Sequence, residues 1–248
     1  MMMLLSFVIG ASVSSFCQVI GYRLPKKRSF IRGRSYCPHC LTSLRWYELI
    51  PIVSFVIQFG RCRTCQRKIP KLHVILEIGM GLLFSINFLI LGMSIEFVMA
   101  CLLFALLCIV FVTDILYMTI PNRVLLVFFP LFLAYQLIHP LYQWWEPVVG
   151  SLTGMLIVAI VILISKGGMG GGDMKFMAVL GSLLGPQRVL LTFVLACFIG
   201  AMIGFYLISF KNWETIRPMP FAPSIVMAVI LTFYFGQQMF ALYISLFT

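Results

Sequence analysis

Long runs of apolar residues make up most of the chain and predict helices that cross a membrane. A spanning α-helix needs about 20 predominantly apolar residues. Turns rich in glycine, proline or asparagine separate the runs. The runs cover, to within a few residues, 1–20, 73–92, 95–116, 123–139, 147–165, 174–186, 189–210 and 223–246. This pattern predicts an all-α, polytopic integral membrane bundle of about eight spans, the first of which is retained.

The sixth run is shorter than the others and predicts a different element. From Asp173 to Pro186 there are 14 residues, which would extend about 21 Å as a helix. The hydrocarbon core of a bilayer is about 30 Å thick. Unless the membrane thins locally, we expect a half-helix or a re-entrant segment here.

Composition excludes a soluble enzyme and a disordered protein. Of the 248 residues, 62% are hydrophobic and 10% are charged, whereas an average soluble domain is about 25% charged. A domain of this size still exposes much of its surface and lacks the interior to bury so many apolar side chains. The chain is therefore predicted to be surrounded by a lipid bilayer.

The charged residues are predominantly basic, with 18 Lys and Arg against 7 Asp and Glu. Twelve of the basic residues lie between Arg23 and Lys71. Alternation of the predicted spans places five more on the same side of the membrane and only Arg188 on the other. The five are Arg123, Lys166, Lys175, Lys211 and Arg217. Because cytoplasmic loops are rich in Lys and Arg, we expect the loop 22–72 in the cytoplasm and both termini outside.

Three regions follow from this topology. Residues 1–21 form the first transmembrane span, residues 22–72 form the cytoplasmic loop, and residues 73–248 form a membrane core of about seven spans. The topology accounts for most of the basic excess, so no nucleic-acid partner is expected.

Four of the eight cysteines form two CxxC pairs in the polar loop. The pairs are Cys37/Cys40 and Cys62/Cys65, with 21 residues between them. Two such pairs can provide four thiolates to one tetrahedral zinc ion, and nearby arginines favour the thiolate form. The loop is therefore predicted to bind a structural Zn²⁺, which stabilises a segment too small to bury a core of its own.

Other roles for the cysteines are disfavoured. A redox function of the pairs conflicts with the predicted cytoplasmic location, where thiols stay reduced, and no thioredoxin-like pattern accompanies them. His39 lies inside the first pair and is expected to be a bystander rather than a ligand. The other cysteines lie singly in apolar runs, where structural thiols are expected; they are Cys17, Cys101, Cys108 and Cys197.

The chain contains only two aspartates, and each lies at the end of a predicted span. Asp114 lies six residues before Ile120-Pro121-Asn122, and Asp173 follows six residues of which five are glycine. The predicted topology places both at the cytoplasmic boundary. Two carboxylates close together in a partly dry site share one proton. One can then deprotonate a water while the other protonates or polarises a scissile carbonyl, as in aspartic proteases.

A structural role is the alternative for each aspartate. Asp173 could cap free amides at a helix N-terminus, and Asp114 could extend toward the membrane interface. The glycines before Asp173 favour a functional site, because they allow close backbone approach and unusual dihedral angles. A phosphate-binding loop is excluded, since no Gly-Lys-Ser/Thr follows at the required spacing.

Taken together, these motifs resemble those of the type IV prepilin peptidase family over nearly the full length of the chain. Residues 170–175, Gly-Gly-Gly-Asp-Met-Lys, match the family's GxGDxK motif, and Asp114 matches its second aspartate. The segments 34–40 and 60–65 resemble its RSxCPxC and GRCxxC motifs. Further similarities are residues 15–25 (with Ser14 where Gly is usual), the WxExIP-like segment 46–51, Glu77, and the PFxP-like segment 220–223.

The resemblance implies a multi-pass aspartic endopeptidase of the bacterial cell membrane. Asp114 and Asp173 would be its catalytic pair, and Gly170, Gly172 and Lys175 would support the catalytic loop. Such enzymes cleave the short basic leader of prepilin-like proteins of pilus, secretion and competence systems. Cleavage occurs on the cytoplasmic side, after a Gly that precedes the hydrophobic segment.

The resemblance also implies a second activity. Many members methylate the new N-terminal amine with S-adenosylmethionine, and the cytoplasmic loop is implicated in this step. Glu48 and Glu77 are the candidate residues for methylation. Glu77 equally fits a buried structural acid, since it lies one turn inside a span.

Two alternatives from other functional classes stay open on the sequence alone. A cation- or proton-coupled transporter would use the three acids Asp114, Asp173 and Glu77 in a pathway. These acids cluster at one face rather than at the midplane, and no repeated halves are visible. A membrane thiol oxidoreductase would use the CxxC pairs, against the reducing compartment expected for them.

Overall fold

The computed structural model describes residues 1–29, 34–139, 143–166, 168–211 and 219–247. Arg217, which the topology argument uses, lies outside the described residues, and so does the side chain of Lys211. The chain folds as two compact units, Met1–Val112 and Thr113–Thr248.

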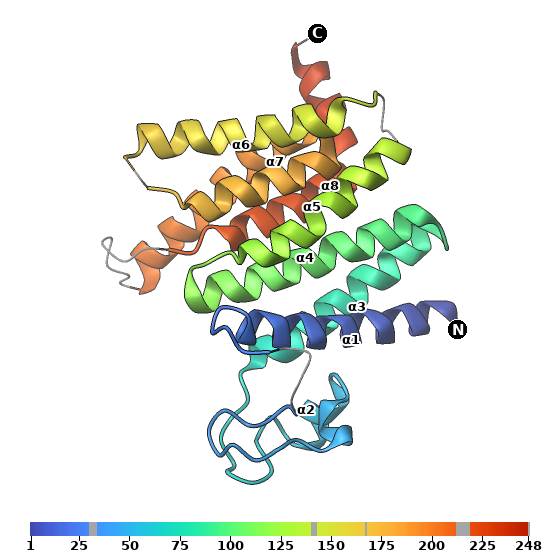
Figure 1. The fold of residues 1–248 in the computed structure, drawn as a ribbon, viewed down its shortest axis with the longest axis vertical. Coiled ribbons are helices and arrows are strands. Elements are labelled where there is room, and N and C mark those ends of the chain that lie inside the picture. Colours follow the sequence, from blue (N-terminus) through green and yellow to red (C-terminus); the bar gives the residue numbers. More distant parts are fainter. Residues whose placement is uncertain (30–33, 140–142, 167, 212–218, 248) are drawn as a thin grey trace. The chain divides into compact units, whose positions relative to one another are not determined.

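The apolar runs form helices in both units, and the described part of the chain is all-α, as predicted (Figure 1). Two short elements, η1 and α2, lie in the polar loop. In chain order the elements are α1 (Met2–Arg23), η1 (Trp46–Leu49), α2 (Val53–Ile57), α3 (Lys71–Leu91), α4 (Ile95–Tyr117), α5 (Asn122–Ile138), α6 (Glu146–Ile164), α7 (Gly171–Lys211) and α8 (Ala222–Phe247).

Six of the described helices are long and apolar enough to cross a membrane, namely α1, α3, α4, α6, α7 and α8. The helix α5 is apolar but has 17 residues. Two of the predicted runs lie within α7, where Gly185 adopts φ 79° and ψ 172° and interrupts the helix. The predicted break at Gly185-Pro186 is therefore confirmed. The eight predicted runs correspond to α1, α3, α4, α5, α6, the two halves of α7, and α8.

The first half of α7 is a short helix enclosed by protein. Residues 171–184 extend about 21 Å, which is less than the thickness of a bilayer core. Phe176, Met177 and Leu180 have no exposed surface. This half of α7 is thus covered by neighbouring helices of the second unit, which suits the short element that the sequence predicts.

In the first unit, α1 and α3 pack through small residues. A Cβ atom added at Gly10 would lie 2.7 Å from the carbonyl oxygen of Met80, and one added at Gly81 would lie 2.7 Å from the ring of Phe7. Such small residues let membrane helices approach closely.

A polar network joins the end of α1 to the start of α3. The side chain of Gln18 donates a hydrogen bond to the carbonyl oxygen of His73 at 3.2 Å, and its amide oxygen bonds to Nδ1 of the same histidine. Tyr22 stacks on His73 with ring centroids 5.3 Å apart. These contacts hold together the two points at which the polar loop leaves and rejoins the helices.

In the second unit, α6 and α7 lie side by side with their backbones in direct contact (Figure 1). A Cβ at Gly150 would lie 2.3 Å from the carbonyl oxygen of Gly181, and one at Gly154 would lie 2.4 Å from that of Met177. Gly150 and Gly154 have the GxxxG spacing of tightly packed membrane helices. This contact fixes the helix that begins at the aspartate motif.

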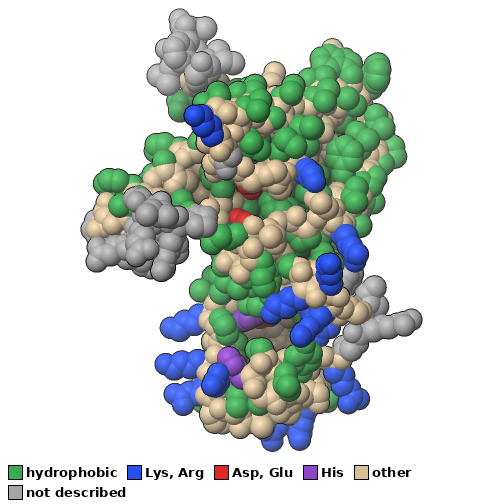
Figure 2. Space-filling view, turned by 60° about the vertical axis from the view of Figure 1, so that its left-hand side comes forward, with side chains coloured by type: hydrophobic (Ala, Val, Ile, Leu, Met, Phe, Trp, Pro, Cys, Tyr) green, Lys and Arg blue, Asp and Glu red, His purple; other side chains and the backbone are tan. Residues whose placement is uncertain are grey.

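The surface separates the helices from the polar loop by side-chain type. On the face in Figure 2, hydrophobic side chains cover most of the helical part, and Lys and Arg gather around the loop. Large apolar side chains such as Leu4, Ile90, Leu126 and Leu163 are more than half exposed. Exposure of this kind suits a protein surrounded by lipid.

Candidate active site and metal centre

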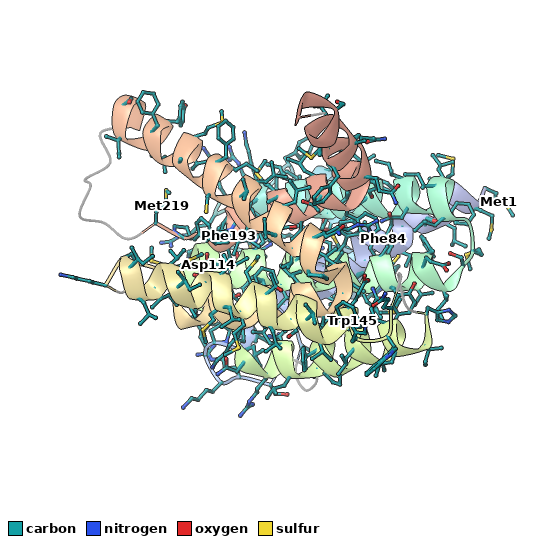
Figure 3. The ribbon with its side chains drawn as sticks, turned by 90° about the horizontal axis from the view of Figure 1, so that it is seen from above. Met1, Phe84, Asp114, Trp145, Phe193 and Met219 are labelled. Atoms are coloured by element: carbon teal, nitrogen blue, oxygen red, sulfur yellow. The ribbon has the colours of Figure 1, made fainter. Side chains whose placement is uncertain are left out.

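Asp114 lies in the last turn of α4 and is buried, with 6% of its surface exposed. Its Oδ2 accepts a hydrogen bond of 2.9 Å from the backbone N–H of Ala222, the first residue of α8. The first amides of a helix lack intrahelical partners and favour an anion. The start of α8 thus holds the carboxylate in place. Asp114 and Trp145 lie toward opposite ends of the second unit (Figure 3).

Asp173 lies in the first turn of α7 and is 9% exposed. Its backbone N–H donates to the carbonyl oxygen of Gly170 at 3.0 Å, and the N–H of Gly170 donates to Oδ2 of Asp173 at 3.3 Å. The two bonds close a tight turn at the helix N-terminus. Asp173 therefore makes a local capping contact, and this contact also fixes the direction of its carboxylate.

The two carboxylates are close enough to interact electrostatically. Both belong to the second unit, although they lie 59 positions apart along the chain. Two buried acids that interact in this way can divide acid and base functions between them. The structure thus brings together the two aspartates that the sequence singles out.

The segments that carry the aspartates also contact each other directly. A Cβ at Gly172 would lie 3.2 Å from the Cβ of Ile120, so this glycine permits close approach to the segment after α4. The ammonium group of Lys175 donates a hydrogen bond of 3.2 Å to Oδ1 of Asn122. Gly172 and Lys175 therefore join the two aspartate segments, and Gly170 orients Asp173.

The four predicted metal-ligating cysteines form one cluster. Their Sγ atoms all lie within 4.8 Å of one another, with 3.9 Å between Cys37 and Cys65 and the same distance between Cys40 and Cys62. In this cluster the sulfurs could hold a metal ion. His39 is not a member, and its Nδ1 lies 2.9 Å from a guanidinium nitrogen of Arg67.

Each CxxC pair folds into the same knuckle. In the first, the N–H of Leu41 donates to the carbonyl oxygen of Cys37, and in the second, the N–H of Gln66 donates to that of Cys62, both at 2.9 Å. Leu41 and Gln66 follow the second cysteine of their pairs and have φ values of 57° and 58°. Four thiolates from two such knuckles are a donor set that suits tetrahedral Zn²⁺.

The thiols of the cluster differ in acidity. Hydrogen bonds from the hydroxyl and the backbone N–H of Thr42 lower the pKa of Cys40 to about 6. The backbone N–H groups of Cys65 and Thr64 also lower the pKa of Cys62. The N–H of Arg67 acts the same way on Cys65, but desolvation and the neighbouring sulfurs outweigh it and raise the pKa of Cys65 to about 11. A bound cation would displace the remaining protons.

The two glutamates assigned to methylation make different contacts. Glu48 is half-buried in η1, and its Oε2 accepts a 2.7 Å hydrogen bond from the backbone N–H of Arg45, which completes a capping box. Glu77 is buried in α3, and its Oε2 accepts a 2.8 Å hydrogen bond from the backbone N–H of Ile52. Ile52 has φ 64°, an uncommon conformation for a β-branched residue. Glu77 therefore holds the polar loop in a strained turn.

Sequence reasoning missed several of these partners. The N–H of Ala222, the amide of Asn122 and the turn at Ile52 each support a candidate residue. Ala222 and Asn122 do lie in the recognised PFxP-like and Ile-Pro-Asn segments. That location is the signal that could have identified them.

Comparisons with known proteins agree with this arrangement. Residues 8–91 match the family described as Bacterial Peptidase A24 N-terminal domain, and residues 101–205 match the Type IV leader peptidase family. The chain is 37% identical over 245 residues to a prepilin leader peptidase/N-methyltransferase of Bacillus subtilis, with 99% of each chain covered. It is 28% identical to proteins of the same name from Aeromonas hydrophila (97% and 93% covered) and Vibrio cholerae (94% and 96%). No solved structure matches the chain.

Proposed function

The chain belongs to the family of prepilin leader peptidase/N-methyltransferases, and on that premise we propose that it is a membrane-embedded aspartic endopeptidase. Its substrates are type IV prepilin-like proteins of a pilus, secretion or competence system. The observation that carries the aspartic mechanism is the pair of buried, interacting carboxylates of Asp114 and Asp173. Each is oriented by a backbone N–H group.

Catalysis divides the two proton transfers between the aspartates. The ionised carboxylate removes a proton from a water molecule, whose oxygen attacks the scissile carbonyl carbon. The protonated carboxyl polarises the carbonyl oxygen, and a proton passes to the leaving amine as the C–N bond breaks.

We propose that cleavage takes place on the cytoplasmic side of the cell membrane, after the Gly that precedes the substrate's hydrophobic segment. The placement of 17 of the 18 basic residues on one predicted face supports a cytoplasmic loop 22–72 with both termini outside. A substrate helix within the membrane would present its leader junction at the interface. Both aspartates lie at helix ends, where such a junction can reach them.

The second proposed activity is methylation of the amine that cleavage releases. S-adenosylmethionine would supply the methyl group, and the loop with its four cysteines would supply the site. Zn²⁺ would be structural, because the cluster has four protein sulfurs and a tetrahedral zinc site with four protein ligands is closed. The close spacing of all four sulfurs favours a metal site over a single redox pair.

Leader cleavage by the purified protein tests the peptidase. A prepilin with its leader is incubated with wild type, Asp114→Asn and Asp173→Asn, and the cleaved product is measured. Each substitution removes one of the two proton-transferring groups with little change in size, so we expect a loss of at least about 10³-fold in rate. Cleavage by either variant at the wild-type rate would rule out this mechanism and would assign the proton transfers to other residues.

Methylation is followed separately with labelled S-adenosylmethionine and a pre-cleaved substrate. Both aspartate variants should still label this substrate, because the aspartates act only on the peptide bond. This comparison also shows that the variants are folded.

A further inference from the structure

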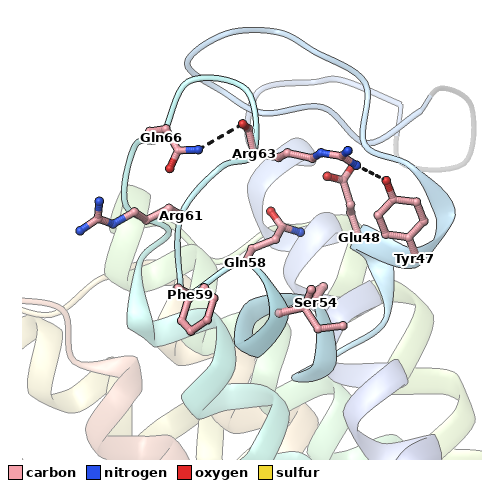
Figure 4. A pocket seen from close by; sticks show the side chains of 9 residues that line it. Tyr47, Glu48, Ser54, Gln58, Phe59, Arg61, Arg63 and Gln66 are labelled. Atoms are coloured by element: carbon pink, nitrogen blue, oxygen red, sulfur yellow. Dashed lines mark hydrogen bonds between the residues drawn. The ribbon is translucent and has the colours of Figure 1, made fainter.

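A cavity of about 560 Å³ opens in the polar loop, beside the second cysteine pair (Figure 4). We infer that this cavity binds the methyl donor S-adenosylmethionine, an inference that rests on the proposed methyltransferase activity. Volumes of about 300–1,000 Å³ are usual for small-molecule sites. Its walls combine acidic, basic and aromatic side chains from η1, from the end of α2 and from the second knuckle. All of them belong to the first unit.

One side of the cavity suits the amino-acid end of the donor. Figure 4 shows the Arg63 side chain reaching toward Tyr47 and Glu48. The guanidinium of Arg63 donates one of its five N–H groups to the hydroxyl of Tyr47. Its other N–H groups can hold an α-carboxylate, and Glu48 can hold the adjacent α-ammonium. The capping hydrogen bond from the backbone of Arg45 fixes the Glu48 carboxylate in advance.

The other side of the cavity suits the adenine ring. Phe59 lines the cavity opposite Tyr47 (Figure 4), and 90% of its surface is exposed. It also adopts φ 49°, in the left-handed region that costs a bulky residue free energy. A phenyl ring this exposed has little packing against the described residues. A flat heteroaromatic ring stacked on it would cover this surface.

The metal knuckle positions one wall of the cavity. Cys62 lies between Arg61 and Arg63, and its N–H and carbonyl groups are both used in the knuckle. The side chain of Gln66 donates a hydrogen bond of 3.3 Å to the carbonyl oxygen of Arg63. Zinc at the four sulfurs would therefore fix the backbone that carries the carboxylate-binding arginine, which gives the metal a function in methylation without a direct part in chemistry.

Direct binding measurements on the full-length, zinc-loaded protein in detergent test the site. Calorimetry is performed with S-adenosylmethionine and with decarboxylated S-adenosylmethionine, which lacks the α-carboxylate. Arg63→Gln should weaken binding of S-adenosylmethionine by about tenfold or more, as expected for loss of a charge-assisted contact. It should leave binding of the decarboxylated compound unchanged, since that compound has no group for Arg63 to hold.

Three further variants complete the test. Glu48→Gln should weaken both compounds, because both contain the ammonium group, and Phe59→Ala should weaken both through loss of stacking. Lys68→Gln is the matched control: it removes one positive charge from the same knuckle, outside the cavity, and should change neither affinity. Zinc content and leader cleavage serve as measures of folding for every variant.

The outcomes separate the binding site from the proposed function. If both Arg63→Gln and Glu48→Gln bind S-adenosylmethionine as tightly as the wild-type protein does, the assignment of the cavity is overturned. The proposed function would still stand in that case, provided that the wild-type protein transfers methyl groups. Equal weakening of both compounds by Arg63→Gln would also overturn the direct contact with the carboxylate. A wild-type protein that neither binds the donor nor transfers methyl groups would refute the methyltransferase itself.

Discussion

The ammonium group of Lys175 lies 3.2 Å from Oδ1 of Asn122, and this hydrogen bond joins the two segments that carry the aspartates. Asn122 begins α5, eight residues after Asp114, and Lys175 lies two residues after Asp173. The contact therefore resists separation of the two carboxylates. It explains why a lysine and an asparagine accompany an acid pair without being acids or bases in the proposed reaction.

Removal of this contact should slow leader cleavage. We expect Lys175→Ala and Asn122→Ala each to lower the rate by about fivefold, because the exposed bond is worth about 1 kcal/mol to the alignment of the pair. The double variant should be little slower than either single variant, since both remove the same bond. Single-turnover cleavage measures this. Fully additive effects would show that the two side chains act independently.

The amide of Ala222 can be removed without changing the charge of the site. Ala222→Pro deletes the N–H that binds Asp114, at a helix start where proline is otherwise accepted. Loss of a hydrogen bond to a charged group costs about 1.5–3 kcal/mol, so kcat should fall by about 10- to 150-fold, with little change in KM. Ala222→Gly keeps the N–H and is the control. If glycine lowers kcat as much as proline, the effect comes from packing and not from the hydrogen bond.

Zinc binding should be lost at acidic pH. The pKa of Cys40 is lowered to about 6 in the folded loop, so its thiolate contributes stability that is complete above the ordinary thiol pKa and is lost as the pH falls through 6. Protons also compete with the metal for the sulfurs. Elemental analysis after dialysis with a chelator should find zinc at pH 8 and none at pH 5.

Single cysteine substitutions locate the metal. Cys40→Ser should lose zinc and methyl transfer and keep leader cleavage, because the cysteines and the aspartates lie in different units. Cys197→Ser, at an exposed thiol of α7, should keep zinc. Full zinc content in Cys40→Ser would exclude the four-sulfur site.

Close contact between α6 and α7 should make Gly150 intolerant of substitution. A methyl group there would lie 2.3 Å from the carbonyl oxygen of Gly181, which cannot retreat within a packed helix. Gly150→Ala should lower stability by about 1–3 kcal/mol. Gly79, in α3, has no atom within 4 Å of the added group, so Gly79→Ala should be neutral or stabilising. Thermal unfolding in detergent compares the two, and equal midpoints would contradict the contact.

Two substitutions of Glu77 distinguish a structural hydrogen-bond acceptor from a charged group that takes part in methylation. Glu77→Gln keeps an acceptor for the N–H of Ile52 and should retain methyl transfer. Glu77→Leu loses the acceptor and should release the strained turn, so methyl transfer falls while cleavage persists. If Glu77→Gln loses as much methyl transfer as Glu77→Leu, the negative charge of Glu77 is required for the methylation reaction.

Local patterns in the sequence predicted the features that depend on local structure. The apolar runs predicted the helices, Gly185-Pro186 predicted the break in α7, and the CxxC spacing predicted the cysteine cluster. The sequence did not predict the contacts between distant segments. The bond from Ala222 to Asp114 joins residues 108 positions apart, and no periodicity or spacing encodes such a pairing.

The cavity was also beyond sequence reasoning, for a related reason. Its lining comes from η1, from the end of α2 and from the second knuckle, and none of these has a regular hydrophobic pattern. In the sequence, nothing distinguishes Phe59 from the other apolar residues of its segment. Only its exposure and its left-handed backbone distinguish it from a core residue.

The two knuckles make the intervening segment separable from the rest of the protein. Because the sulfurs of Cys37 and Cys65 lie 3.9 Å apart, residues 38–64 begin and end at nearly the same point. The contact of Gln18 with His73 holds α1 against α3 without using this segment. A chain could therefore gain, lose or exchange it with little disturbance of the membrane helices. Leader cleavage and methylation can then evolve as independent traits of one polypeptide.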